Sequence, residues 1–286
     1  MPSLKKIIAI VVAALLLAYV GGAALIYAYG PHLIFVPIKT VTDTPANHGA
    51  QFQPVRIPVG HDDAGLAAWW VAAEPKLARP EKAKVLLYLH GNYGNVGDNA
   101  AHAARLSTYG VNVLIPDYRG FGDSSGPFPS EPRVYEDAET AWQWLLREKH
   151  YTPAEIVIYG HSLGGAIAIE LASQHPDAGG LIVESSFTSV LEMSRLNPKF
   201  RLLPMSWLVT QRFDSIDRVG SLKMPVLFIH GNADHVVPLF MAQQMYARVP
   251  GQKALAIIPG GGHDNCAVVG GDLYVTAVRQ FVEGLF

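Results

Sequence analysis

A serine between glycines is the strongest chemical signal in the chain. Residues 160–164 read Gly-His-Ser-Leu-Gly, the Gly-x-Ser-x-Gly pattern in which a serine stands on a tight turn between a strand and a helix. A strand-like run at 156–159 precedes the motif, and a helix-compatible run at 166–172 follows it. The two glycines remove side chains that would collide across so tight a turn. The pattern therefore predicts that Ser162 is a nucleophile at the N-terminus of a helix.

The base that would activate this serine is predicted to be His263. A serine hydroxyl is a weak nucleophile until a base takes its proton. His263 follows the last strand-like run through three glycines at 260–262, and such a loop lets a histidine reach back over a sheet edge. The other ten histidines stand in the N-terminal connector, in turns, beside helices or in other motifs, and they are interpreted as solvated or structural.

The acid that would orient the histidine is predicted to be Asp234. It stands just after the strand-like run 226–230, which puts its carboxylate at the end of a strand, where sites of open parallel sheets form. It also lies between the serine and the histidine in the chain, which is the expected order. Glu184, at the end of the preceding strand, and Asp264, next to His263, remain alternative acids.

Two backbone N–H groups are predicted to hold the negative oxygen that forms when the serine attacks a carbonyl. One belongs to Leu163, the residue after the nucleophile. The other comes from the loop after the strand-like run 85–89, and it is assigned to Asn92, with Tyr93 as the alternative. His90, at the start of this loop, is interpreted as a brace that holds it by hydrogen bonding.

Short apolar runs alternate with longer amphipathic ones, which predicts an α/β fold with a mostly parallel sheet covered by helices on both faces. The predicted strands are 55–59, 66–71, 84–90, 111–117, 155–160, 180–184, 225–230 and 253–258. The predicted helices are 96–109, 131–149, 163–175, 239–249 and 271–286. No helix separates the first two strands, so they are expected to form an antiparallel hairpin at the sheet edge.

One connection is far longer than the others. Residues 186–222 join two predicted strands and are rich in Leu, Met and Trp. Connections of this length are uncommon without structure of their own. The segment is predicted to be a small helical cap, at about 187–222, over the strand ends. The alternative is a packed surface excursion with no role in binding a ligand.

The N-terminus predicts a membrane anchor. Residues 7–29 carry no charge, and 23 helical residues reach about 35 Å, enough to cross a hydrocarbon core of about 30 Å. Lys5 and Lys6 favour a cytoplasmic N-terminus, and Tyr27 and Tyr29 suit the opposite interface. A cleaved signal peptide is the alternative, but the apolar run is longer than usual for one.

The chain is divided accordingly into three parts: a transmembrane anchor (1–30), a juxtamembrane connector (31–53) and a catalytic domain (54–286). The prediction is a single-pass membrane protein whose catalytic domain lies opposite the cytoplasm, in a periplasm, an organelle lumen or the cell exterior.

Composition narrows the classes of partner. The 286 residues are 50% apolar and 16% charged, with a formal net charge of −2. The chain has no surplus of basic residues, so its charge does not indicate nucleic-acid binding. The single cysteine excludes an internal disulfide, and no metal-ligand cluster, phosphate loop or dinucleotide motif is present. Neither a cofactor nor a metal is therefore expected. The oligomeric state is left open.

The ordered motifs together resemble the α/β-hydrolase-domain serine hydrolases that carry an N-terminal membrane segment, a group with bacterial members and a eukaryotic branch that includes depalmitoylases. The resemblance covers roughly residues 50–286 and rests on the segments 90–92, 117–122, 160–165, 184–189 and 231–238. It implies an eight-stranded core and the triad Ser162, Asp234 and His263. Asp117 and Arg119, in the second of these segments, are interpreted as structural.

The predicted activity is acyl transfer to water through an acyl-enzyme, with the chain acting as a carboxylesterase, a lipase or an acyl-protein thioesterase. A small-molecule or lipid-like acyl substrate is favoured, because the cap is apolar and the domain would be tethered at a bilayer. The alternatives are a serine peptidase or an acyltransferase with the same triad, or a non-catalytic membrane-tethered binding protein.

Overall fold

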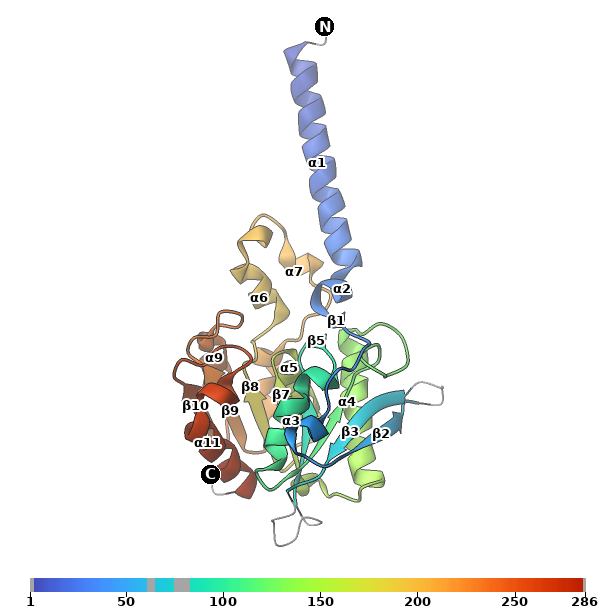
Figure 1. Cartoon of the computed structure of the whole chain (residues 1–286). Helices are drawn as coiled ribbons and strands as arrows, with labels where there is room; N and C mark the ends of the chain where they lie inside the picture. The colour runs from blue at the N-terminus through green and yellow to red at the C-terminus, as the bar shows by residue number, and fades with distance from the viewer. Residues whose placement is uncertain (1–2, 61–64, 75–82, 285–286) are drawn as a thin grey trace.

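An eight-stranded sheet forms the centre of the computed structural model, which describes residues 3–60, 65–74 and 83–284 (Figure 1). The strands are β2 (Phe52–Pro58), β3 (Gly65–Val71), β4 (Val85–Leu89), β6 (Asn112–Pro116), β7 (Ile156–His161), β8 (Gly180–Glu184), β9 (Val226–Gly231) and β10 (Lys253–Ile258). Their order is β10-β9-β8-β7-β4-β6-β3-β2, parallel except where β3 pairs with β2 and β6. The predicted strands and the edge hairpin are confirmed.

Helices cover both faces of this sheet, as predicted for strands that are apolar on both sides. One face carries α4 (Glu131–Arg147), α5 (Leu163–Gln174) and α9 (Leu239–Arg248), and the other carries α3 (Ala100–Ser107) and α11 (Gly271–Glu283). Three short helical segments, η3 (Val96–Asn99), η4 (Pro153–Glu155) and α10 (Cys266–Val269), complete the connections. The last predicted helix was drawn to residue 286, and residues 285–286 lie outside the described residues.

The apolar spacing of α4 explains how these helices pack. Its buried residues include Val134, Ala138, Ala141 and Leu145, three or four positions apart, so they form one stripe along the helix. Because this stripe faces the sheet, most polar side chains of α4 are left partly or fully exposed, with Asp137 as the buried exception. The same pattern in α11 buries Tyr274, Val278 and Phe281 against the opposite face.

The N-terminal helix α1 (Leu4–Ala28) projects away from the rest of the chain (Figure 1). None of its residues, all of which are described, is buried, and an 18-residue stretch of it has a mean hydropathy of 2.6. Within the described ranges it is the one helix long and apolar enough to cross a membrane. Its 25 residues reach about 37 Å, so it fits a single-pass anchor.

The segment after α1 is an ordered strap that packs on the α/β domain. It contains α2 (Gly30–Ile34), β1 (Val36–Pro37) and the short 3-10 helix η1 (Pro45–His48), and Phe35 between the first two is buried in the core. Strand β1 pairs in parallel with β5 (Tyr93–Gly94), in the loop after β4. The sequence analysis did not predict this two-stranded sheet.

The segment predicted as a cap is helical. It comprises α6 (Val190–Leu196), α7 (Met205–Leu208), α8 (Ser215–Arg218) and the 3-10 turns η5 (Pro198–Phe200) and η6 (Val219–Ser221). Helices α6 and α7 project at the same end of the molecule as α1 (Figure 1). The cap and the C-terminal end of α1 therefore lie next to each other, beyond the carboxyl ends of the parallel strands.

Arg119, interpreted from sequence as structural, joins the turn after β6 to α4. Its Nε donates to Asp137 at 2.5 Å and its backbone N–H donates to the same carboxylate at 2.8 Å. Its guanidinium also contacts Glu136. The two acids differ in exposure, because the side chain of Asp137 is 1% exposed and that of Glu136 is 59% exposed. Burial raises the pKa of Asp137 to about 6, even though hydrogen bonds and charge from Arg119 lower it.

We expect Asp137→Ala to destabilise the fold far more than Glu136→Ala. Removing Asp137 leaves the largely buried Arg119 charge without its buried partner, which costs about 3–5 kcal/mol. The exposed pair with Glu136 contributes below about 1 kcal/mol. Urea unfolding in detergent at pH 8, where Asp137 is ionised, measures both. Equal losses in the two variants would contradict this account.

Candidate active site

The turn after β7 holds Ser162 in a conformation that is rare for a residue with a side chain. Its φ is 54° and its ψ is −121°, and a left-handed φ is costly for residues other than glycine. Helix α5 begins at the next residue, so the serine stands at its N-terminus. The turn is tight enough that a Cβ at Gly160 would lie 2.2 Å from the carbonyl oxygen of Gly164. The strand-turn-helix predicted around the motif is present.

The structure brings Ser162, His263 and Asp234 together from three separate loops. The Nε2 of His263 lies 2.9 Å from the Ser162 hydroxyl oxygen, and its Nδ1 lies 2.8 Å from Oδ2 of Asp234. The serine is 9% exposed. These are the distances that an activated serine needs before substrate arrives.

The two alternative acids line the same cavity as the serine but make other contacts than one with the His263 ring. Glu184 is buried and accepts hydrogen bonds from the hydroxyl groups of Tyr159 and Tyr274. Asp264 has a side chain that is 81% exposed, and its carboxylate lies 3.8 Å from Nε2 of His161. Within the described part of the chain, the carboxylate that contacts the His263 ring is that of Asp234.

Asp234 is held as an anion by the loop around it. Its Oδ1 accepts the backbone N–H groups of Val236 and Val237, each at 2.8 Å. Burial opposes ionisation, but hydrogen bonds from His230, His263 and the Val237 N–H outweigh it, so the pKa of Asp234 falls well below its ordinary value. An ionised carboxylate at this position accepts a hydrogen bond from the Nδ1–H of His263, which keeps the proton on Nδ1. The Nε2 atom is then left to accept from the serine.

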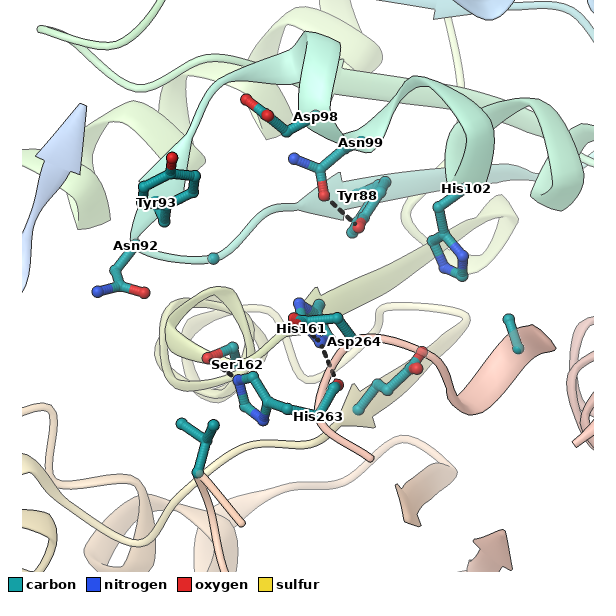
Figure 2. A pocket seen from close by; sticks show the side chains of 14 residues that line it. Tyr88, Asn92, Tyr93, Asp98, Asn99, His102, His161, Ser162, His263 and Asp264 are labelled. Atoms are coloured by element: carbon teal, nitrogen blue, oxygen red, sulfur yellow. Dashed lines mark hydrogen bonds and ion pairs between the residues drawn. The ribbon is translucent and has the colours of Figure 1, made fainter. Parts of the chain in front are cut away.

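The two residues predicted to supply the oxyanion donors are both near the serine. Leu163 is the first residue of α5, and Asn92 lines the same cavity as Ser162. Figure 2 shows Asn92 and Tyr93 on the wall opposite Ser162 and His263. The loop that carries Asn92 is braced at its start by buried His90, as predicted. The His90 Nδ1 lies 2.8 Å from the Gly91 carbonyl, and its Nε2 lies 3.3 Å from Asp117.

The strap from the N-terminus also holds Asn92. The side-chain amide of Asn92 donates to the backbone carbonyl of Ile34 at 2.6 Å. The backbone carbonyl of Asn92 accepts a hydrogen bond from the Val36 N–H at 2.9 Å. Asn92 is thus fastened on two sides by residues of the predicted connector.

A cavity of about 480 Å³ opens beside the serine, and most of the residues that line it carry a polar group. It is lined by Tyr88, Gly91, Asn92, Tyr93, Asp98, Asn99, His102, His161, Ser162, Glu184, Val236, His263, Asp264 and Ala267 (Figure 2). None of these described lining residues is Lys or Arg. The cavity is therefore better suited to a neutral hydrogen-bonding group than to an anion.

His102 belongs to this cavity, although the sequence analysis treated it as solvated or structural. Its Nε2 lies 3.0 Å from the Tyr159 hydroxyl, inside the network around Glu184. Burial lowers its pKa to about 4, so it is neutral at pH 7. Its position three residues after Asn99 puts both side chains on one face of the helical segment 96–107. That spacing is the signal that could have found it.

A metal ion fits this site poorly. His161, His263 and Asp264 have candidate ligand atoms within 4.8 Å of one another. Both ring nitrogens of His263 already lie in hydrogen bonds to Ser162 and Asp234. An ion would have to displace one of these bonds and would gain only His161 and an exposed carboxylate.

Comparison with known proteins places the chain in a family. Residues 80–219 match the family described as serine aminopeptidase S33 (Hydrolase_4). Over 197 residues, 69% of each chain, the sequence is 35% identical to protein Rv2307c of Mycobacterium tuberculosis. The chain belongs to the α/β-hydrolase family. This assignment makes it a hydrolase.

Two further members are informative. The lysophosphatidylserine lipase ABHD12 of zebrafish is 34% identical over 247 residues, which are 77% of this chain and 64% of ABHD12. The structure of the Pyrococcus furiosus esterase Pf2001 is similar with a TM-score of 0.70 and 20% identity, covering 88% of this chain and 98% of that one. At this identity the esterase shows the shared fold alone.

Proposed function

We propose that the chain is a membrane-anchored serine hydrolase that cleaves ester or thioester bonds through Ser162, His263 and Asp234. The observation that carries the proposal is the hydrogen-bonded series from Ser162 through His263 to the ionised Asp234, at the N-terminus of α5. The lysophosphatidylserine lipase among the similar proteins favours an ester substrate.

The geometry supports the following reaction. His263 takes the Ser162 proton on Nε2 while the serine oxygen attacks the substrate carbonyl, and Asp234 stabilises the imidazolium that results. The N–H groups of Leu163 and Asn92 hold the developing oxyanion. His263 then gives its proton to the departing alcohol or thiol. A water molecule, activated by the same base, releases the acid from Ser162.

A fluorophosphonate probe tests the nucleophile. We expect the full-length protein to be labelled and Ser162→Ala to be unlabelled, because the probe forms a covalent bond only with an activated serine. Labelling is measured by in-gel fluorescence and by mass spectrometry of the labelled peptide. Absence of labelling, or labelling that survives in Ser162→Ala, would favour the non-catalytic alternative.

The acid is tested by a matched pair of amide substitutions. Asp234→Asn should lower kcat by about 10³–10⁴-fold, because the histidine loses the anion that fixes its tautomer. Glu184→Gln keeps an acceptor for the tyrosines and should cause a much smaller loss. Hydrolysis of p-nitrophenyl butyrate gives both rates, with circular dichroism to check folding. A larger loss in Glu184→Gln would move the acid to that residue.

The N-terminal helix supports the membrane part of the proposal. We propose that α1 stays attached as a single-pass anchor with its N-terminus in the cytoplasm, because Lys5 and Lys6 precede the apolar run. The catalytic domain then lies on the opposite side of the membrane. Contacts of α1 with the cap, through Tyr19 and Ile26, would be lost if the helix were removed.

A second, mostly apolar groove lies between the cap and the segment around α2, and it supports an acyl substrate with a hydrocarbon chain. Ile34, whose carbonyl holds Asn92, is one of the residues that line this groove, and Val190 of the cap is another. The lysophosphatidylserine of the ABHD12 name is not carried over, because the polar cavity offers no Lys or Arg among its described lining residues to pair with a phosphate.

We expect p-nitrophenyl octanoate to be hydrolysed with a higher kcat/KM than p-nitrophenyl acetate. The leaving group is constant in this pair, so the comparison isolates the chain, and each buried CH₂ contributes about 0.8 kcal/mol. Steady-state kinetics below the critical micelle concentration measures the ratio. A preference for acetate would argue against the lipid-like substrate, and cleavage of aminoacyl p-nitroanilides alone would favour the peptidase alternative.

A further inference from the structure

The tip of the cap contacts α1 at a point well before the C-terminal end of the helix. The Tyr19 hydroxyl donates to the carbonyl of Leu202 at 3.0 Å. Tyr19 precedes the last residue of α1, Ala28, by nine positions, which is about 14 Å along the helix axis. Figure 1 shows α7 next to the lower part of α1. The cap thus rises alongside the segment that would cross the membrane.

The length of α1 sets the depth of this contact. The helix reaches about 37 Å and the hydrocarbon core is about 30 Å thick, so a centred helix leaves only its last few residues outside the hydrocarbon. Tyr19 would then lie roughly 10 Å inside the hydrocarbon edge. Surface-bound elements commonly enter a bilayer by about 5–10 Å, so this depth is one that the cap tip can reach.

The side chains at the tip suit lipid. Leu202 is 85% exposed and Trp207 is 80% exposed, and large apolar side chains gathered on one surface mark an interaction site. Lys199 and Arg201 lie within the same segment, are exposed, and make no ion pair among the described residues. Their long side chains can carry the charge back to the headgroups.

Several backbone groups of the tip have hydrogen-bond partners within the protein, which lowers the cost of placing them in hydrocarbon. The Leu203 N–H donates to Phe200, the Met205 N–H donates to Leu203, and the Leu202 carbonyl receives the Tyr19 hydroxyl. The tyrosine hydroxyl, which would otherwise be unpaired in lipid, finds its partner in the same bond.

A groove of about 220 Å³ runs between the foot of the anchor and the cap. Its walls include Ile26, Leu33 and Ile34 on one side and Met193, Phe200 and Leu208 on the other. None of its described lining residues is charged. Such a groove, placed at the hydrocarbon edge, matches the chemistry of an acyl chain.

We propose that the cap tip, residues 196–209, is inserted into the leaflet that holds the C-terminal half of α1, and that the groove takes an acyl chain of a bilayer lipid. The inference rests on the anchoring part of the proposed function and not on catalysis. The enzyme would receive its substrate sideways from the bilayer and not from solution.

Bromine quenching of Trp207 tests the insertion. The full-length protein is reconstituted in phosphatidylcholine vesicles with or without dibrominated acyl chains, which quench tryptophans in contact with them. We expect quenching in the wild type, loss of most of it in Trp207→Phe, and wild-type quenching in the control Trp70→Phe. Trp70 packs against Trp144 and Tyr151 on the sheet.

The outcomes separate this proposal from the catalytic one. Equal quenching of the wild type and Trp207→Phe would overturn the insertion of the cap, whatever the activity. Failure of the protein to float with vesicles would overturn both the anchor and the insertion, while probe labelling of Ser162 would still report on catalysis.

A photoreactive lipid tests the groove. Phosphatidylcholine carrying a diazirine in its acyl chain is crosslinked in the same vesicles, and the modified peptides are identified by mass spectrometry. We expect modification within 190–211 as well as within α1. Crosslinks confined to α1 would overturn the acyl-chain site.

Discussion

The close approach of three backbone segments at the turn after β7 is the constraint on which the site depends. A Cβ at Gly164 would lie 2.0 Å from the carbonyl oxygen of Leu89, at the end of β4, so α5 can start where it does only because glycine stands there. This start puts Ser162 in its left-handed conformation and places the helix N-terminus beneath it. The neighbouring strand then brings the Asn92 loop to the same point. The nucleophile and the proposed oxyanion donors are thus arranged by one packing requirement.

The electrostatic arrangement follows from the same sheet edge. Parallel strands end together, so the loops after β7, β9 and β10 deliver the serine, the carboxylate and the imidazole to one place. Asp234 keeps its charge because backbone N–H groups and two histidines surround it. The nearby Glu184 is occupied by tyrosine hydroxyls instead. Asp234 and Glu184 are thus two buried carboxylates in one region, of which the first contacts the His263 ring and the second contacts tyrosine hydroxyls.

Local patterns allowed the sheet, the covering helices and the contact among Ser162, Asp234 and His263 to be predicted from the sequence. Each depends on a run of apolar residues or on a turn whose residues are adjacent in the chain. The strap was missed, because β1 and β5 have two residues each and pair across 57 positions, which leaves no periodicity to detect. The role of His102 was missed because its partners Tyr159 and Tyr274 come from distant elements. The contact of Tyr19 with Leu202 was missed for the same reason.

The strap has a mechanical consequence. Only Tyr29 separates α1 from α2, and two residues after α2 the Val36 N–H is bonded to Asn92. Because the connection from α1 to Asn92 contains no flexible linker, we expect a change in the tilt of α1 to move the loop that faces the serine. A transmembrane helix longer than the local hydrocarbon thickness tilts to bury its length. If α1 is the single-pass anchor proposed above, bilayer thickness acts through this tilt on the geometry of the active site, and the rate of the proposed hydrolysis would differ between membranes of different composition.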